Sequence, residues 1–309
     1  MTVAQAPVRP RAALAAPPRR PARRRSRHWL YILPAAIFLG ALSIYPLIQL
    51  GRMSVSAVTV RNLFGEWPFV GLQNFADGWT DGSIPAGLGR TLVFVAIVTG
   101  LGLVVGIGAA VALRGSSRWG AAILALMVFI WALPPVVSGS VWKFLLAEDG
   151  LLNNLIGLFG ATPFPFLYDE RYALVSVAVV NAWAVIPFNA LVFRAAILNI
   201  PGELFEAAQL DGASPSQEFR HIILPALRPT TIVLTVLTVV YAFRSFDFVY
   251  VMTKGGPGTA TQTLPYMSYQ QAFIGYDFSG GAATAVVTVI LVLALALVYS
   301  RSVLKEEHE

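Results

Sequence analysis

Residues 206–225 read EAAQLDGASPSQEFRHIILP and form the longest polar interruption in the second half of a very apolar chain. Of the 309 residues, 56% are hydrophobic and 12% are charged, whereas soluble domains carry about 25% charged residues. A soluble core cannot bury that much apolar surface, so a membrane is the expected solvent. We therefore expect the segment 200–228, here called the polar loop, to lie between two membrane spans.

Long apolar runs predict six membrane-spanning helices. The first run has roughly 23 residues and reaches about 35 Å at ~1.5 Å per residue, enough to cross a hydrocarbon core near 30 Å. The predicted fold class is thus an all-α polytopic membrane protein whose membrane domain covers 29–303. The expected spans are 29–51, 89–113, 119–147, 172–199, 229–251 and 279–300.

The positive charges predict the topology. Cytoplasmic segments of membrane proteins carry an excess of Lys and Arg. If the amino terminus is cytoplasmic, 15 of the 22 Lys and Arg residues fall in the inner segments 1–28, 114–118, 194–228 and 301–309. We therefore expect both termini, and the polar loop, on the cytoplasmic side.

The two ends of the chain are expected to be cytoplasmic tails. Residues 1–28 contain eight Arg, five Pro and no acid, a composition that cannot form a packed core. Such a tail is expected to be disordered and to contact anionic membrane lipid. No aromatic residues alternate with these arginines, so a nucleic-acid partner is not expected. Residues 304–309 form the second, shorter tail.

Local signals predict two short helices within the polar loop. Pro201 suits a first turn, because its missing N–H costs nothing there. Asp211-Gly212 predicts the end of the first helix, since glycine takes a left-handed turn without steric cost. Ser214-Pro215 is typical of the cap and first turn of a second short helix, which prolines further on are expected to end.

The pattern E-A-A, three residues, G, nine residues, I-x-L-P resembles the cytoplasmic loop of permease subunits in binding-protein-dependent ABC importers. The resemblance is to the sugar-type branch, which includes maltose, glycerol-3-phosphate and trehalose permeases. It covers about residues 30–300 and implies the fold of a type I ABC importer permease. Three other stretches resemble that branch: Tyr31-Ile-Leu-Pro-Ala35, Gly71-Leu-Gln-Asn-Phe75 and Thr253-Lys-Gly-Gly-Pro257.

The resemblance implies that the polar loop docks on an ATPase subunit and couples its closure to the spans. The alternative is a cytoplasmic helical hairpin with no special purpose, which a bare E-A-A tripeptide would favour. The glycine and the I-x-L-P at matching spacings favour the coupling role. The residues implied in coupling are Glu206, Ala207, Ala208, Asp211, Gly212, Ile222, Leu224 and Pro225.

The resemblance also implies an assembly in a bacterial plasma (inner) membrane. One such chain supplies half of a translocation pathway, and a second permease subunit supplies the other half. A dimer of ATPase (nucleotide-binding) subunits would bind ATP and Mg, and an extracytoplasmic substrate-binding protein would deliver a sugar or related polyol. ATP-driven closure would then switch the spans from inward-open to outward-open.

The chain itself is not expected to be an enzyme or to bind a cofactor. It has no G-x-x-x-x-G-K-[ST] phosphate loop, so ATP hydrolysis is expected on a separate subunit. Three scattered His and no Cys make no metal site arguable.

Polar residues within the spans are candidates for the substrate path. Charges in spans are costly and usually face protein or water. Arg244 and Asp247 are three residues apart and are expected on one face of the fifth helix, either lining the path or neutralising each other. In the fourth span, polar and aromatic side chains flank Pro187. The candidates are Asn181, Trp183, Asn189, Tyr241, Arg244 and Asp247.

Two other classes of membrane protein remain as alternatives. An ion-coupled secondary transporter is expected to show repeated halves and midplane charges, whereas this chain shows no repeat and few such charges. An intramembrane enzyme would need a catalytic group of residues within the spans, and Asp247 is the one acid well inside a predicted span.

Overall fold

A computed structural model describes the backbone of residues 29–115 and 117–306. The chain divides between Leu47 and Ile48 into two units, which we describe separately. The described part of the first unit is the beginning of helix α1 (Trp29–Ser54), and this helix continues into the second unit. The tail predicted over 1–28 lies outside the described residues. Of the tail predicted over 304–309, the first three residues belong to the last helix and the rest lie outside them.

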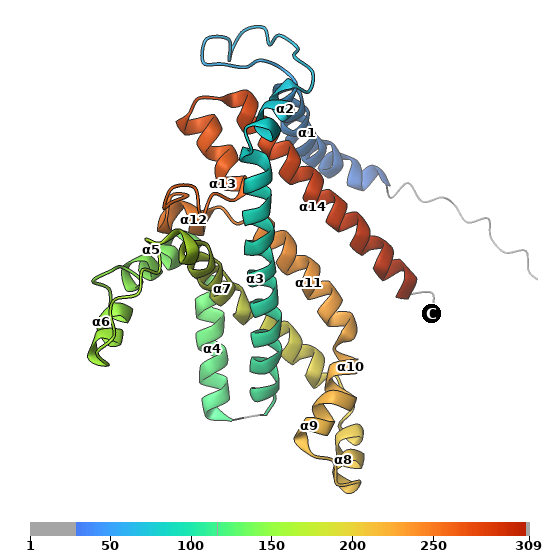
Figure 1. The fold of residues 1–309 in the computed structure, drawn as a ribbon. Coiled ribbons are helices and arrows are strands. Elements are labelled where there is room, and N and C mark those ends of the chain that lie inside the picture. Colours follow the sequence, from blue (N-terminus) through green and yellow to red (C-terminus); the bar gives the residue numbers. More distant parts are fainter. Residues whose placement is uncertain (1–28, 116, 307–309) are drawn as a thin grey trace, which may run out of the picture. The chain divides into compact units, whose positions relative to one another are not determined.

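The described residues form helices and no strand, apart from one isolated bridge between Ser56 and Phe69. Five helical stretches are long and apolar enough to cross a membrane, or six if one bent pair counts as a span. The predicted all-α polytopic fold is therefore confirmed. The helices after α1 are α2 (Gln73–Thr80), α3 (Ser83–Ala112), α4 (Arg118–Ala132), α5 (Pro135–Leu145), α6 (Leu151–Leu158), α7 (Glu170–Leu198), α8 (Gly202–Leu210), α9 (Pro215–Glu218), α10 (Leu224–Ala226), α11 (Arg228–Phe243), α12 (Asp247–Met252), α13 (Leu264–Tyr269) and α14 (Phe278–Glu306) (Figure 1).

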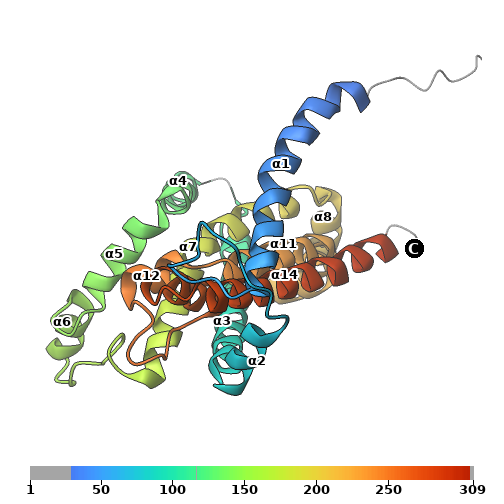
Figure 2. The same ribbon diagram turned by 90° about the horizontal axis from the view of Figure 1, so that it is seen from above.

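The third expected span, 119–147, is not one continuous helix. It consists of α4 and α5, which are bent by 104° relative to each other. Two consecutive prolines explain the break, since neither Pro134 nor Pro135 has an N–H to donate. Pro134 also keeps the preceding Leu133 out of the helical region, at ψ 135°. Figure 2 shows α5 leaving the break in a new direction and continuing towards α6.

The fifth expected span, 229–251, is interrupted as well. Helix α11 ends before Arg244, and α12 begins at Asp247. The expectation that these two residues share one face of a continuous helix is therefore wrong. The segment between them holds no proline or glycine. A tertiary contact stabilises the break instead: the buried Asn181 of α7 donates from Nδ2 to Ser245 Oγ at 2.7 Å.

Helices α3 and α7 pack against each other more extensively than any other pair in the described chain, and α11 packs against α3. Figure 1 shows α7 crossing α3 at the centre of the second unit, with α11 beside them. Two hydrophobic cores lie along this packing. One includes Phe94 and Val177, and the other, which includes Phe193 and Leu234, extends to the polar loop.

Glycines on α3 allow this close approach. An added Cβ on Gly106 would lie 2.9 Å from Asn189 Cβ, and one on Gly102 would lie 3.1 Å from Val185 Cγ1. Both glycines are buried, and their spacing of four residues puts them on one helix face. Small residues at this spacing therefore bring the backbones of α3 and α7 together.

Helix α7 begins at a capping residue outside the span. Asp169 Oδ1 accepts the Arg171 backbone N–H at 2.8 Å, and its Oδ2 accepts from Arg171 Nη2 at 3.1 Å. Hydrogen bonds from the Arg171 guanidinium, and next from its N–H, hold the pKa of Asp169 below its usual value. The ionised cap fixes the first turn of the helix that carries much of the site.

Candidate functional site

The polar loop contains the first helix that its sequence predicts. Helix α8 starts at Gly202, directly after Pro201, and ends at Leu210. Gly212 follows in the left-handed region at φ 74°. The predicted start and end of this helix are therefore confirmed.

The turn after α8 is a Schellman motif. The Gly212 N–H donates to Gln209 O at 3.1 Å, and the Ala213 N–H donates to Ala208 O at 2.8 Å. These two bonds satisfy carbonyl groups that the end of a helix would otherwise leave without partners. Because the motif needs a positive φ at its glycine, the angle between the two halves of the loop depends on Gly212.

The second half of the loop begins as predicted but continues further. Ser214 and Gln217 form a capping box, in which the Ser214 N–H donates to Gln217 Oε1 at 2.7 Å. The expected short helix, however, runs from α9 through a π-helical turn (Phe219–Ile223) into α10, and α11 follows after Leu227. The loop is thus joined to the fifth span by nearly continuous helix.

The exposed face of α8 combines acidic, small and apolar side chains. Glu203, Glu206 and Ala207 are exposed. Leu210, one turn after Glu206, is 90% exposed at the end of the helix. Leu210 is thus an exposed apolar side chain beside acidic and small ones on this helix. Leu210 lies outside the set of coupling residues predicted from the sequence, although its position four residues after Glu206 places it on the same helix face.

The I-x-L-P segment differs from the exposed face of α8 because one of its residues is buried in the core. Ile223, the variable position, is 1% exposed and belongs to the core beneath the loop. Leu224 is 44% exposed, Pro225 is exposed and Ile222 is half-buried. The buried contact of this segment is therefore made by a residue outside the predicted set.

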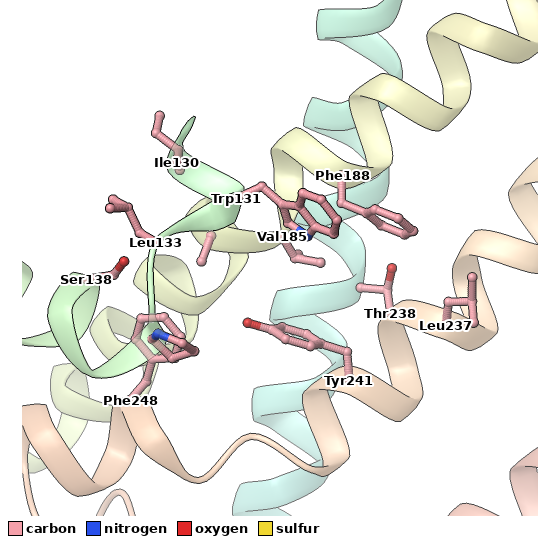
Figure 3. A pocket seen from close by; sticks show the side chains of 12 residues that line it. Ile130, Trp131, Leu133, Ser138, Val185, Phe188, Leu237, Thr238, Tyr241 and Phe248 are labelled. Carbon is pink, nitrogen blue, oxygen red and sulfur yellow. The ribbon is translucent and has the colours of Figure 1, made fainter. Parts of the chain in front are cut away.

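A cavity of about 250 Å³ lies beside the break between α4 and α5 (Figure 3). Thr238, on its wall, lies about ten residues into α11, or about 15 Å along the helix, half the thickness of a ~30 Å hydrocarbon core. The cavity thus lies about halfway along the fifth expected span, 229–251. Its lining comes from α4, α5, α7, α11 and α12 and the break between α4 and α5, and consists of Ile130, Trp131, Leu133, Pro135, Ser138, Ala184, Val185, Phe188, Leu237, Thr238, Tyr241 and Phe248.

The cavity lining is uncharged and rich in aromatic rings. Trp131 and Phe188 stack with ring centroids 5.6 Å apart. Tyr241 points its hydroxyl into the space bounded by these rings and Phe248 (Figure 3). Hydroxyls of Ser138 and Thr238 add polar groups to an otherwise apolar wall. Of the predicted candidates, Tyr241 is the one that lines this cavity.

Two predicted amides connect helices instead of lining the cavity. Asn181 and Asn189 are both fully buried. Asn189 Nδ2 donates to Thr238 Oγ1 at 3.2 Å, and Asn181 bonds to Ser245. In this conformation both side chains hold α7 against the fifth span.

The remaining candidates lie elsewhere. Trp183 packs edge-on against Trp142, with centroids 5.4 Å apart, and lines an apolar groove between α5, α6 and α7. Arg244 is exposed and Asp247 is half-buried. Within the described part of the chain no ion pair joins them. Among the cavity residues that sequence reasoning missed, Trp131 lies three residues before Pro134. The paired prolines are a signal that the interpretation of 119–147 as one span did not use.

Residues 102–304 match the family described as "Binding-protein-dependent transport system inner membrane component". The chain is 30% identical over 272 residues to the trehalose/maltose transport system permease protein MalF of Thermococcus litoralis, covering 88% of this chain and 91% of that protein. It is 32% identical over 277 residues to the sn-glycerol-3-phosphate transport system permease protein UgpA of Yersinia pestis, covering 89% and 93%. It is also 32% identical over 290 residues to the diacetylchitobiose uptake system permease protein DasB of Streptomyces coelicolor, covering 91% and 88%.

Solved structures share the fold. A chain of the bacterial alginate ABC transporter, solved in complex with an alginate pentasaccharide-bound periplasmic protein, superposes with a TM-score of 0.75 at 21% identity, covering 88% of this chain and 93% of that one. A chain of the inward-facing MetNI methionine ABC transporter superposes with a TM-score of 0.52 at 23% identity, covering 70% and 93%.

Proposed function

Because this chain belongs to the family of binding-protein-dependent transport system inner membrane components, we propose that it moves a neutral saccharide through the membrane as half of an ABC importer's pathway. The chain is a transport permease, and its fold is that of type I ABC importer permeases, as the resemblance implied. The uncharged aromatic lining of the cavity beside the α4–α5 break supports the cargo assignment.

The chemistry of the lining favours a neutral sugar over an anionic cargo. Sugar rings offer apolar faces to aromatic side chains and hydroxyls to polar ones, and Trp131, Phe188 and Tyr241 supply both. A phosphate or carboxylate in this cavity would meet no positive side chain, and burying an unpaired charge is costly. MalF and DasB are named for uncharged sugars, whereas UgpA is named for a phosphate ester. The cavity therefore supports a cargo like that of the first two.

The size of the cavity supports a second permease subunit. Sites for small molecules have volumes of roughly 300–1,000 Å³, and this cavity has about 250 Å³. One chain alone therefore provides too little space for a disaccharide. A second, similar subunit facing the same opening would complete the chamber.

The polar loop is the proposed contact with the ATPase subunits, which would bind ATP and Mg. Its acidic and small-residue face, with the exposed Leu210, suits insertion into a groove of another protein. Near-continuous helix from α9 into α11 would carry the motion of the loop to Thr238 and Tyr241 in the cavity wall. We infer that the loop and both termini lie in the cytoplasm, where ATP is, and that an extracytoplasmic binding protein delivers the sugar.

Mild-detergent purification of the tagged chain from its native membrane tests this assembly. We expect an ATPase and a second multi-span subunit to co-purify. Proteoliposomes containing the complex and its binding protein are expected to accumulate labelled maltose or trehalose only with internal ATP. A chain that purified alone, with uptake driven by an ion gradient, would contradict the proposal and favour a secondary transporter.

Substitutions in the cavity are expected to weaken sugar transport. Trp131→Ala removes one of two stacked rings, and Tyr241→Phe removes a hydroxyl whose hydrogen bond would contribute about 0.5–1.5 kcal/mol. We expect Tyr241→Phe to slow ATP-driven uptake by about two- to tenfold and Trp131→Ala to slow it more. Initial uptake rates in proteoliposomes provide the measurement.

Trp119→Ala is the matched control for the cavity variants, because Trp119 is 82% exposed on α4 and outside the cavity lining. It is expected to transport at the wild-type rate. The cargo assignment fails if both cavity variants transport maltose and trehalose normally, or if the wild-type complex accepts sn-glycerol 3-phosphate and neither sugar.

A further inference from the structure

A single arginine outside the predicted coupling residues joins both halves of the polar loop to α3. Arg114 follows the end of α3, and its Nη2 donates to Glu218 Oε2 of α9 at 3.1 Å. The same guanidinium lies over the ring of Phe205 in α8, with Cζ 5.5 Å from the centroid. Arg114 thus contacts the helix before the Gly212 turn and the helix after it.

The partner of this arginine is buried. The Glu218 side chain is 7% exposed, whereas that of Arg114 is 39% exposed. A carboxylate removed from water needs a partner of opposite charge. A guanidinium suits this position because its edge can bond a carboxylate while its face lies on an aromatic ring.

The end of α3 is itself fixed to α7. Arg194 of α7 donates from Nε to the carbonyl of Leu113 at 2.7 Å, one residue before Arg114. Further along α3, Gly102 and Gly106 contact α7 at Val185 and Asn189. Motion of the α3 end would therefore move α3 and α7 together.

This packing leads to the cavity. Val185 lines the cavity, and Asn189 bonds to Thr238, which also lines it. The loop is joined covalently to α7 and α11, but the link to α7 passes through the short segment 199–201. Without a further attachment on the α8 side, a push on α8 would pivot this half of the loop about that segment.

We propose that Arg114 clamps the polar loop to the end of α3, so that a push on the loop moves α3 and α7 as one body. Arg114 is a positioning residue that acts through Glu218 and Phe205. This inference rests on the proposed coupling of the loop to an ATPase. It adds a third helix to the two through which the loop is connected in sequence.

The test compares variants of the complete transporter, co-expressed with its partner subunits and reconstituted with labelled maltose or trehalose. Arg114→Gln and Glu218→Gln are expected to keep ATP hydrolysis within about twofold of wild type. We expect sugar transported per ATP to fall at least about fivefold, the lower end for coupling between sites. Reversing the pair, with Arg114→Glu and Glu218→Arg together, restores the ion pair but not the guanidinium on Phe205, so we expect it to restore part of that ratio.

Arg118→Gln is the matched control, because Arg118 is exposed at the other end of the same link between α3 and α4. It is expected to leave the ratio unchanged. A ratio that stays at the wild-type value in Arg114→Gln would overturn the proposal. So would loss of hydrolysis and assembly in proportion to transport, because that pattern indicates a purely structural pair.

A second measurement does not depend on the cargo. The chain has no cysteine, so nitroxide labels can be attached at Val104→Cys on α3 and Ser216→Cys in the loop, both exposed positions. In the wild type we expect one narrow distribution of the distance between the two labels, and we expect it to stay unchanged when the complex is trapped in its ATP-bound state. In Arg114→Gln it is expected to broaden and shift. Identical narrow distributions in the wild type and in Arg114→Gln would overturn the clamp. Failure of sugar uptake by the wild-type complex would bear on the proposed cargo alone.

Discussion

Replacing Gly106 with leucine is expected to destabilise the chain by forcing apart the packed helices α3 and α7. A Cβ at this position alone would lie 2.9 Å from Asn189 Cβ and 3.4 Å from the Ala190 backbone nitrogen. A leucine would force α3 and α7 apart, and overpacking of a tight interface typically costs about 1–3 kcal/mol. We expect Gly106→Leu to lower the thermal unfolding midpoint of the purified complex and its amount in the membrane.

Gly108→Leu is the matched control for this prediction. Gly108 lies two residues further along the same helix, is exposed, and has no neighbouring atom within 4 Å of an added Cβ. The same side chain there is expected to change neither the midpoint nor the amount in the membrane. Equal behaviour of the two variants would show that close helix approach at Gly106 does not stabilise the fold.

Replacing Gly212 with valine is expected to uncouple transport while the chain still inserts into the membrane. At φ 74° a β-branched residue is strained, and holding it there costs roughly 1–3 kcal/mol. No atom lies within 4 Å of an added Cβ, so the effect comes from backbone strain and not from a clash. Loss of the Schellman bonds would change the angle between α8 and α9, and we expect ATP-driven uptake to fall at least about tenfold.

Gly212→Asn separates strain from size, because asparagine tolerates the left-handed region better than other side chains. It is expected to retain most of the uptake of the wild type. Immunoblots are expected to show equal amounts of the wild type, Gly212→Val and Gly212→Asn in the membrane. Normal uptake by Gly212→Val would count heavily against a coupling role for this turn.

The polar loop was the most predictable part of the molecule because its signals are local. A proline before α8, a glycine after it and a serine capping α9 each act on hydrogen bonds within a few residues. The spans were predictable for a similar reason, since hydropathy and length decide whether a helix crosses a membrane. The break at Pro134 and Pro135 had a clear local signal too, which a count of apolar residues over 119–147 does not register.

The contacts between distant segments were not predictable from one sequence. Ser245 interrupts the fifth span without proline or glycine, and its buried partner Asn181 lies 64 residues earlier. Arg114 and Glu218 are 104 residues apart. Asn181 and Asn189 were singled out as polar groups in a span, but which surface they face depends on packing that the sequence pattern does not reveal.

The paired prolines of the third span also change which backbone groups surround the cavity. In an unbroken helix, residues 134 and 135 would donate to the carbonyls of Ile130 and Trp131, one turn earlier. Proline supplies neither donor; the Leu133 N–H reaches Ile130 O at 3.2 Å, and the helical donor for Trp131 O is lost. A main-chain acceptor is thereby released about halfway along the expected span 119–147, beside the indole that stacks on Phe188. The two prolines therefore expose a backbone carbonyl that can accept a hydrogen bond from a hydroxylated molecule. The neighbouring side chains stay apolar and remain compatible with the bilayer.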